Sequence, residues 1–354
     1  MTMTQAAGTV PNDLRAGDTV RVRSTEEILA TLDADGRVDG QPFMPEMLQF
    51  AGRELPVSKI AHKTCDTINR PSEGLRRLDR TVHLADARCD GSAHGGCQAG
   101  CLLFWREEWL ETPEGIPLRA QPRDPSPVAT EKTLQDDTVA GVDADGATLY
   151  RCAATELIRA SSPLPSYEIG QYVADVRSRN YRPLYVIRGL LILLFNKFQV
   201  LSRKLPPRLR IADGLPYPFF RGTGPAPKPE RLGLQPGDLV EIKSKDEIMA
   251  TLGPNNKNRG LIFDFEMLPY CGRRARVLKT VDKIIEEHTG RMLRLRDCVI
   301  LDQVTCVGRY HRFCPRAIHI YWREAWLSRV DESSTVAANS ASREESVRSG
   351  SSDE

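Results

Sequence analysis

The chain lacks a strong charge of either sign. Its 354 residues contain 49 Lys and Arg against 47 Asp and Glu, which gives a net charge of +2. Domains that bind nucleic acids usually carry a much larger basic excess, so overall charge does not indicate such a partner. The Gly-rich phosphate loop, the dinucleotide fingerprint, the kinase signature and the hydrolase elbow are also missing. These absences weaken most enzyme classes and favour a non-catalytic role.

The chain also lacks a basic and apolar signal segment at its start, which reads Met-Thr-Met-Thr-Gln. It has no Cys-x-x-Cys redox motif. Its nine cysteines are an odd number in a long chain, which does not fit the disulfide framework of a small secreted domain. We therefore expect a cytoplasmic protein whose thiols are reduced or bound to metal.

The sequence does contain an internal repeat. Residues 17–32 return as residues 237–252, with Gly-Asp, Glu-Ile and Ala-Thr-Leu at matching positions. The match closes with Trp-Arg-Glu-x-Trp-Leu at 105–110 and again at 322–327. Each copy spans about 95 residues, which is within the usual size of an independent domain.

Each copy opens with a pattern typical of a strand followed by a short helix. The alternating apolar residues of 18–23 and 238–243 predict the strand. The Ser-x-x-Glu spacing at 24–27 and 244–247 predicts a capping box at the start of the helix. Further β-prone runs cover residues 55–60, 80–84, 275–280 and 292–301. Short, closely spaced strands with one brief helix are typical of a small, partly open barrel.

The sequence predicts seven segments, of which two are the similar modules. In chain order they are a disordered N-terminus 1–13, module 1 at 14–112, a linker 113–165 with a hairpin at 139–149, a basic amphipathic helical segment 166–205, a Pro-rich linker 206–230, module 2 at 231–330, and a disordered tail 331–354. The predicted fold class is mainly β with some α, in which tandem small barrels are joined by a helical linker. We expect the two Trp residues of each closing motif to pack in the core of their module.

A cluster of Cys and His residues lies just before each closing motif. The first has the spacing Cys-x4-His-x2-Cys-x3-Cys and the second Cys-x4-His-x2-Cys-x4-His. Thiolate and imidazole are preferred ligands of zinc, and four of them form a closed structural site. We therefore expect one structural zinc ion in each module. The predicted ligands are Cys89, His94, Cys97, Cys101, Cys306, His311, Cys314 and His319.

Other interpretations of these residues stay open at this stage. The cysteines could be ordinary buried residues, or Cys97 beside His94 could be a catalytic thiol in a loop that offers backbone amides as an oxyanion hole. The repeated Glu46 and Glu266 could be catalytic acids, although anchoring a turn is the favoured role. The remaining cysteines are optional ligands or core residues: Cys65, Cys152, Cys271 and Cys298.

The segment between Asp175 and Arg210 has the largest charge asymmetry of the chain, with nine basic residues and one acid. The basic residues bracket an apolar run at 184–201. The favoured interpretation is a helix buried between the modules with its cations on the solvated face. The alternative is a helix in the interface of an anionic membrane, because Arg188 and Lys197 would be costly inside a spanning helix.

The opening strand and turn of each module resemble a small SH3-like, KOW-like barrel of translation and transcription factors. The chain as a whole is similar to uncharacterised bacterial proteins that carry the elements found here at 260–263, 271–273 and 322–324. Module 1 departs from these elements at Gln41, Pro42 and Ala51. The resemblance implies two SH3-like Cys/His modules and supplies no activity.

Taken together, the sequence favours a zinc-stabilised, non-catalytic scaffold with two similar surfaces for a protein partner. The first alternative is a nucleic-acid binder that uses barrel loops and the Arg-rich segment. The second is a metal- or thiol-dependent enzyme of unknown reaction. Peripheral contact of 175–210 with the inner face of an anionic membrane is a further expectation.

Overall fold

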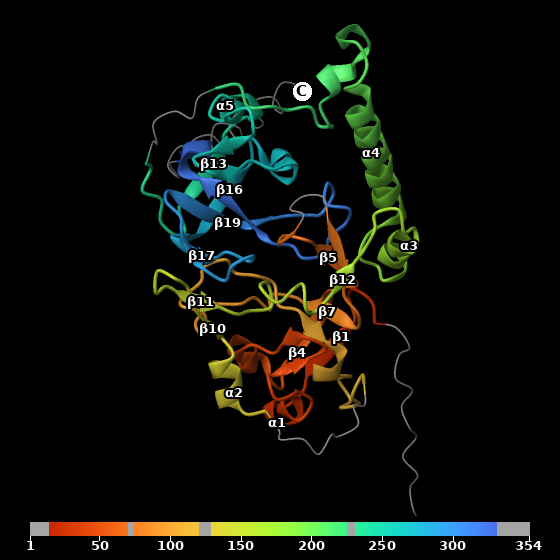
Figure 1. Cartoon of the computed structure of the whole chain (residues 1–354), viewed down its shortest axis with the longest axis vertical. Coiled ribbons are helices and arrows are strands. Elements are labelled where there is room, and N and C mark those ends of the chain that lie inside the picture. The colour runs from red at the N-terminus through yellow and green to blue at the C-terminus, as the bar shows by residue number, and fades with distance from the viewer. Residues whose placement is uncertain (1–13, 70–73, 120–128, 225–230, 331–354) are drawn as a thin grey trace, which may run out of the picture. The chain divides into compact units, whose positions relative to one another are not determined.

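The protein is described by a computed structural model that covers residues 14–69, 74–119, 129–224 and 231–330. Strands predominate and a smaller number of helices accompany them, as predicted (Figure 1). The segments 1–13 and 331–354, predicted to be disordered, lie outside the described residues.

The chain divides into two compact units. The first comprises the chain to Phe219 together with Lys283–Arg294 and Cys306–Ile318. The second comprises Phe220–Asp282, Leu295–Thr305 and the chain from His319. The division differs from the predicted modules 14–112 and 231–330, because two segments of the second copy belong to the first unit.

The first unit is built on a five-stranded antiparallel sheet in the order β8-β7-β4-β1-β9. Its strands are β1 (Thr19–Val22), β4 (Glu54–Ile60), β7 (Thr81–Leu84), β8 (Trp105–Arg106) and β9 (Leu110–Glu111). The predicted capping box is confirmed, since the Ser24 hydroxyl accepts from the Glu27 amide at the start of α1 (Thr25–Leu29). Trp105 and Trp109 are fully buried, and Phe43 contacts both rings edge to face, which confirms their role in the core.

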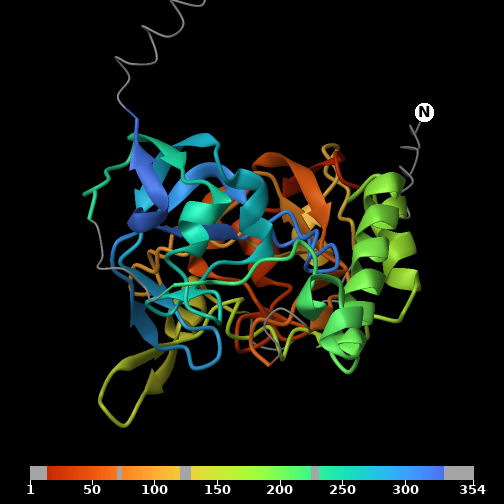
Figure 2. The same cartoon turned by 90° about the horizontal axis from the view of Figure 1, so that it is seen from above.

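Smaller sheets and helices complete the first unit. The strands are β2 (Arg37–Val38), β3 (Gln41–Pro42), β5 (Lys63–Cys65), β6 (Leu75–Arg77), β10 (Val139–Val142), β11 (Thr148–Tyr150), β12 (Ser162–Pro163), β17 (Lys283–Ile285) and β18 (Met292–Arg294). The helices are η1 (Pro45–Phe50), η2 (Glu107–Trp109), α2 (Glu131–Asp136), α3 (Gly170–Arg177), α4 (Pro183–Ser202), η3 (Pro207–Leu209) and η4 (Ile211–Gly214). The β10–β11 hairpin confirms the prediction for 139–149, and it projects from the first unit (Figure 2).

The second unit also has a five-stranded antiparallel sheet, in the order β20-β19-β16-β13-β21. Its strands are β13 (Leu239–Ile242), β16 (Arg274–Thr280), β19 (Cys298–Thr305), β20 (His319–Arg323) and β21 (Leu327–Arg329). The other elements are α5 (Lys245–Met249), β14 (Lys257–Asn258), β15 (Leu261–Ile262), η5 (Phe265–Tyr270) and η6 (Glu324–Trp326). Ser244 and Glu247 form the second predicted capping box, and Trp322 and Trp326 are fully buried in this unit's core.

The apolar run at 184–201 forms α4, but the favoured prediction that this helix is buried is wrong. Leu184, Leu191 and Leu194 are 80%, 63% and 66% exposed. Among the described residues α4 is the one helix long and apolar enough to cross a membrane, with a mean hydropathy of 1.6. The sequence pattern located the helix correctly, while its surroundings depend on contacts that the pattern does not encode.

His83 on β7 makes the stability of the first unit dependent on pH. Burial lowers its pKa from 6.5 to about 4, although the Leu103 carbonyl 2.8 Å from Nδ1 opposes this effect. The unfolded chain therefore binds a proton at higher pH than the folded chain, and stability is lost as the pH falls from about 7 toward 4. We expect the free energy of unfolding to fall by about 2 kcal/mol between pH 7 and pH 5 because of this residue.

The variant His83→Asn is the test of this expectation, because its amide can still donate to the Leu103 carbonyl but does not titrate. Urea denaturation at pH 7 and pH 5 should show a smaller pH effect in the variant, by the same ~2 kcal/mol. An equal pH effect in both proteins would show that His83 is not the titrating group.

Candidate metal centre

The two predicted Cys/His loops, Cys89–Cys101 and Cys306–Ile318, have the same backbone hydrogen bonds. At the base of each loop its first amide donates to its last carbonyl, at 2.8 Å in the first and 2.9 Å in the second. At the tip, the amide of Cys97 donates to the His94 carbonyl at 3.2 Å, and that of Cys314 to the His311 carbonyl at 3.1 Å. The matching sequence spacing therefore produces a matching loop.

A glycine two positions after the first cysteine permits the turn of each loop. Gly91 has φ +74°, and a Cβ there would lie 2.0 Å from the Cys97 carbonyl oxygen. Gly308 has φ +71°, and a Cβ would lie 2.5 Å from the Cys314 carbonyl oxygen. Other residues would be strained and would push the loop open. The Cys-x-Gly motif of both loops was therefore a sequence signal for this turn. The prediction considered only the spacing of the Cys and His residues and missed it.

Each loop is completed by a strand from the other copy of the repeat. On β17, the Ile285 amide donates to the Cys97 sulfur at 3.4 Å. On β5, the Cys65 amide donates to the Cys314 sulfur at 3.1 Å. The two strands occupy corresponding positions in the repeat, and both contacts lie within the first unit. Each loop therefore contacts a strand of the other copy, while β5 stays paired with β6 and β17 with β18.

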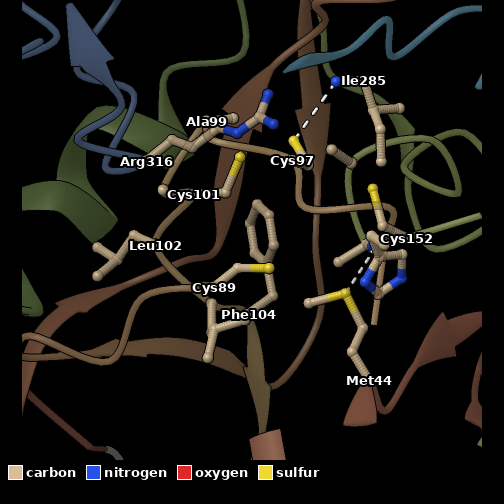
Figure 3. A pocket seen from close by; sticks show the side chains of 15 residues that line it. Met44, Cys89, Cys97, Ala99, Cys101, Leu102, Phe104, Cys152, Ile285 and Arg316 are labelled. Carbon is tan, nitrogen blue, oxygen red and sulfur yellow. Dashed lines mark hydrogen bonds between the residues drawn. The ribbon is translucent and has the colours of Figure 1, made fainter. Parts of the chain in front are cut away.

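Four cysteines line one small cavity of about 40 Å³ beside the first loop. They are Cys89, Cys97, Cys101 and Cys152, whose side chains surround the same space in Figure 3. Apolar side chains such as Leu103 and Phe104 form much of the remaining wall. Cys152 was predicted only as an optional ligand, and the structure brings it to the predicted cluster.

His94 is held by acceptors on both sides of its ring. Nδ1 lies 2.6 Å from Oε1 of Glu46, and Nε2 lies 2.9 Å from the Arg151 carbonyl oxygen. Glu46 also accepts from the Ala93 amide at 3.1 Å, so it anchors the loop as the favoured prediction expected. Donor atoms of Glu46, Cys89 and His94 lie within 4.8 Å of one another, and this group could hold a metal ion.

A second group of donors surrounds the loop of the second copy. The Cys306 sulfur lies 3.6 Å from Nδ1 of His311, and the thiol of Cys65 hydrogen-bonds to the Cys314 sulfur. Cys65 was also predicted only as an optional ligand. The predicted fourth donor, His319, is buried at the start of β20 in the second unit.

Burial shapes the acidity of these thiols. It raises the pKa of Cys101 to about 11 and that of Cys152 to about 12. Burial would raise the pKa of Cys314 too, but the hydrogen bond from Cys65 and those from backbone amides lower it to about 6. Thiolate is the metal-binding form, so Cys101 and Cys152 would have to lose their protons to bind a metal, whereas Cys314 loses its proton more readily.

Arg316 supplies a positive charge close to both groups of thiols. Its guanidinium lines the first cavity and lowers the pKa of both Cys101 and Cys314. It is 2% exposed, and its Nη2 donates to Oε1 of Glu287 at 2.7 Å. The buried cation favours thiolate at each site, and the ion pair fixes its position.

The two remaining cysteines, Cys271 and Cys298, belong to the second unit and pack there as partly buried and buried residues. The structure thus separates the four optional cysteines into two that join the loops and two that do not.

Comparison of the chain with protein-family models, curated proteins and solved structures finds no match.

Proposed function

We propose that the protein is a non-catalytic binding protein whose first unit is held together by metal ions at two thiol-rich sites. The contact of each Cys/His loop with a strand of the other copy is the observation that carries this proposal. The contacts Cys97–Ile285 and Cys65–Cys314 join residues 188 and 249 positions apart. A metal bound by both Cys65 and Cys314 would offset the chain entropy that closing so long a loop costs. A metal at the first loop would fix the Cys97 sulfur that accepts from Ile285.

The proposed ion is zinc, with one ion at each loop. Zinc prefers four thiolate or imidazole ligands, and four cysteines line the cavity beside the first loop. The proposed ligands are Cys89, Cys97, Cys101 and Cys152 at the first site, and Cys65, Cys306, His311 and Cys314 at the second. At the first site, His94 is proposed to support the loop without binding the metal, because both its ring nitrogens already face acceptors.

The proposed architecture behind this function is a tandem duplication of SH3-like modules. The corresponding order of strands in the two five-stranded sheets supports it, as do the paired capping boxes. Two similar modules can present two similar surfaces to a protein partner at a fixed separation. The proposed compartment is the cytoplasm, where thiols stay reduced unless a metal binds them.

Metal analysis of untagged protein tests the proposal. Elemental mass spectrometry should find about two zinc ions per chain, and removal by a chelator should unfold the first unit. Cobalt exchanged into the sites should give the visible spectrum of tetrahedral thiolate ligation, unchanged by added azide. A protein that folds fully without metal would overturn the proposal.

A spectrum that changes with azide would instead show an open coordination position, which is the mark of a catalytic metal. That result would favour the enzyme alternative, for which the close approach of Cys306 and His311 is the structural basis. Metal sites without an open coordination position at both loops would support the proposed binding function.

A further inference from the structure

Helix α4 presents a continuous apolar stripe on its exposed side. The residues follow one another at alternating steps of three and four, which places them on one face of the helix. Their exposed fractions range from 47% to 80%. The stripe consists of Leu184, Ile187, Leu191, Leu194, Phe198 and Leu201.

The opposite side of α4 is attached to the first unit. Gly189 packs so closely on Phe313 that a Cβ would lie 2.3 Å from its ring. Gln199 donates to the carbonyl oxygens of Ile211 and Leu215 at 2.8 and 2.9 Å. Lipid could not surround the helix without breaking these contacts. The helix is therefore suited to lie flat against an apolar layer, with the apolar stripe facing that layer and the opposite side facing the first unit.

Basic residues border the stripe along its length. At 3.6 residues per turn, Arg188 and Lys197 fall on opposite edges of the stripe, and both are exposed. Arg182 is exposed just before α4, and Arg203, Lys204 and Arg208 are exposed just after the stripe. An apolar face with cations along both edges is the pattern of a helix that binds at the interface of an anionic membrane.

The charge also distinguishes lipid from other occupants. In a dimer formed through this face, the segments 175–210 of the two copies would lie against each other. Each has nine basic residues and one acid, so the two segments would repel. A nucleic acid would satisfy the cations but would leave the six apolar side chains in water. An anionic bilayer satisfies both the apolar stripe and the cations.

We propose that α4 docks the protein on anionic membranes, with the stripe inserted among the acyl chains and the flanking cations at the headgroups. The stripe and its flanking cations lie outside both thiol sites, although α4 itself packs on Phe313 of the second loop. In this proposal α4 takes a peripheral position in the plane of the interface, although its length and hydropathy would suit a spanning helix.

Flotation of the metal-loaded, full-length protein with vesicles tests the proposal. We expect flotation with phosphatidylcholine vesicles containing phosphatidylglycerol, and at least tenfold weaker binding to phosphatidylcholine alone. Leu191→Glu with Leu194→Glu should reduce binding at least tenfold. Arg203→Gln with Lys204→Gln should reduce it about fivefold for each charge removed.

The matched control is Val139→Glu with Val142→Glu, which makes the same change at exposed apolar positions of β10. It should float like the native protein, and circular dichroism should show that all variants are folded. Native protein that stays at the bottom of the gradient would overturn the proposal. So would a dimer dissociated by the Leu variants, or salt-sensitive binding of an oligonucleotide in place of vesicles.

Discussion

Cys152→Ser and Cys65→Ser are each expected to remove about one metal ion per chain. Both cysteines lie outside the two loops in sequence, yet each joins the thiols of one loop. Structural zinc contributes about 10–16 kcal/mol to folding, and this contribution is lost with the ion. The thermal unfolding transition of the first unit should therefore disappear or fall by more than about 20 °C. Elemental mass spectrometry and scanning calorimetry measure the two effects.

Cys271→Ser is the matched control for these variants. Cys271 is also partly buried, and burial raises its pKa to about 11, but it packs in the core of the second unit. Its replacement should leave the metal content at its native value. Full metal content in all three variants would exclude Cys65 and Cys152 as ligands. Equal losses in all three would show a general effect of removing a buried thiol.

The sequence predicted local features of the fold well because their causes are local. The capping boxes at Ser24 and Ser244 depend on side chains three residues apart. The strands that follow from alternating residues, such as β1 and β13, lie where they were predicted. The two Cys/His loops likewise owe their shape to hydrogen bonds within each loop and to the turns at Gly91 and Gly308.

The partners of each loop could not be predicted because they come from the other copy. The spacing Cys-x4-His-x2-Cys identifies donors within a loop, but nothing in it indicates that Cys65 lies beside Cys314. A repeat also suggests two self-contained modules, and the contacts of β17 with the first loop and of β5 with the second leave no trace in the local sequence pattern. Distinguishing the two arrangements required the long-range contacts of the folded chain.

The predicted burial of α4 failed for a related reason. An apolar run of this length is equally consistent with a core helix and with a helix at a membrane surface. The two cases differ in which side chains meet the rest of the protein. Here Val186, Gly189 and Gln199 make those contacts, and the leucines of the exposed stripe do not. The exposed stripe is therefore a consequence of tertiary structure.

Lys63→Met is expected to lower the free energy of unfolding by about 3–5 kcal/mol, because it removes the ammonium that faces the buried Asp175 carboxylate, while the His62 imidazole remains 3.3 Å from Oδ1. Lys63 on β5 and Asp175 on α3 are both fully buried, with Nζ 2.5 Å from Oδ2. The ammonium also faces the rings of Tyr172 and Phe313, so it links β5 to the second Cys/His loop. Burial lowers the pKa of Lys63, and the charge of Asp175 opposes that shift.

The double variant Lys63→Met with Asp175→Leu should recover most of the lost stability, since replacing a whole buried ion pair by apolar residues is often neutral. Lys132→Met is the exposed control. Its pair with Asp136 has side chains 81% and 64% exposed, so the change should stay within about 0.5 kcal/mol. Denaturant unfolding of the native protein, of the single variants Lys63→Met and Asp175→Leu and of the double variant measures the coupling between Lys63 and Asp175. A loss below about 1 kcal/mol for Lys63→Met would mean that Asp175 is already neutral or hydrated, and that apolar packing rather than this ion pair holds β5 against α3.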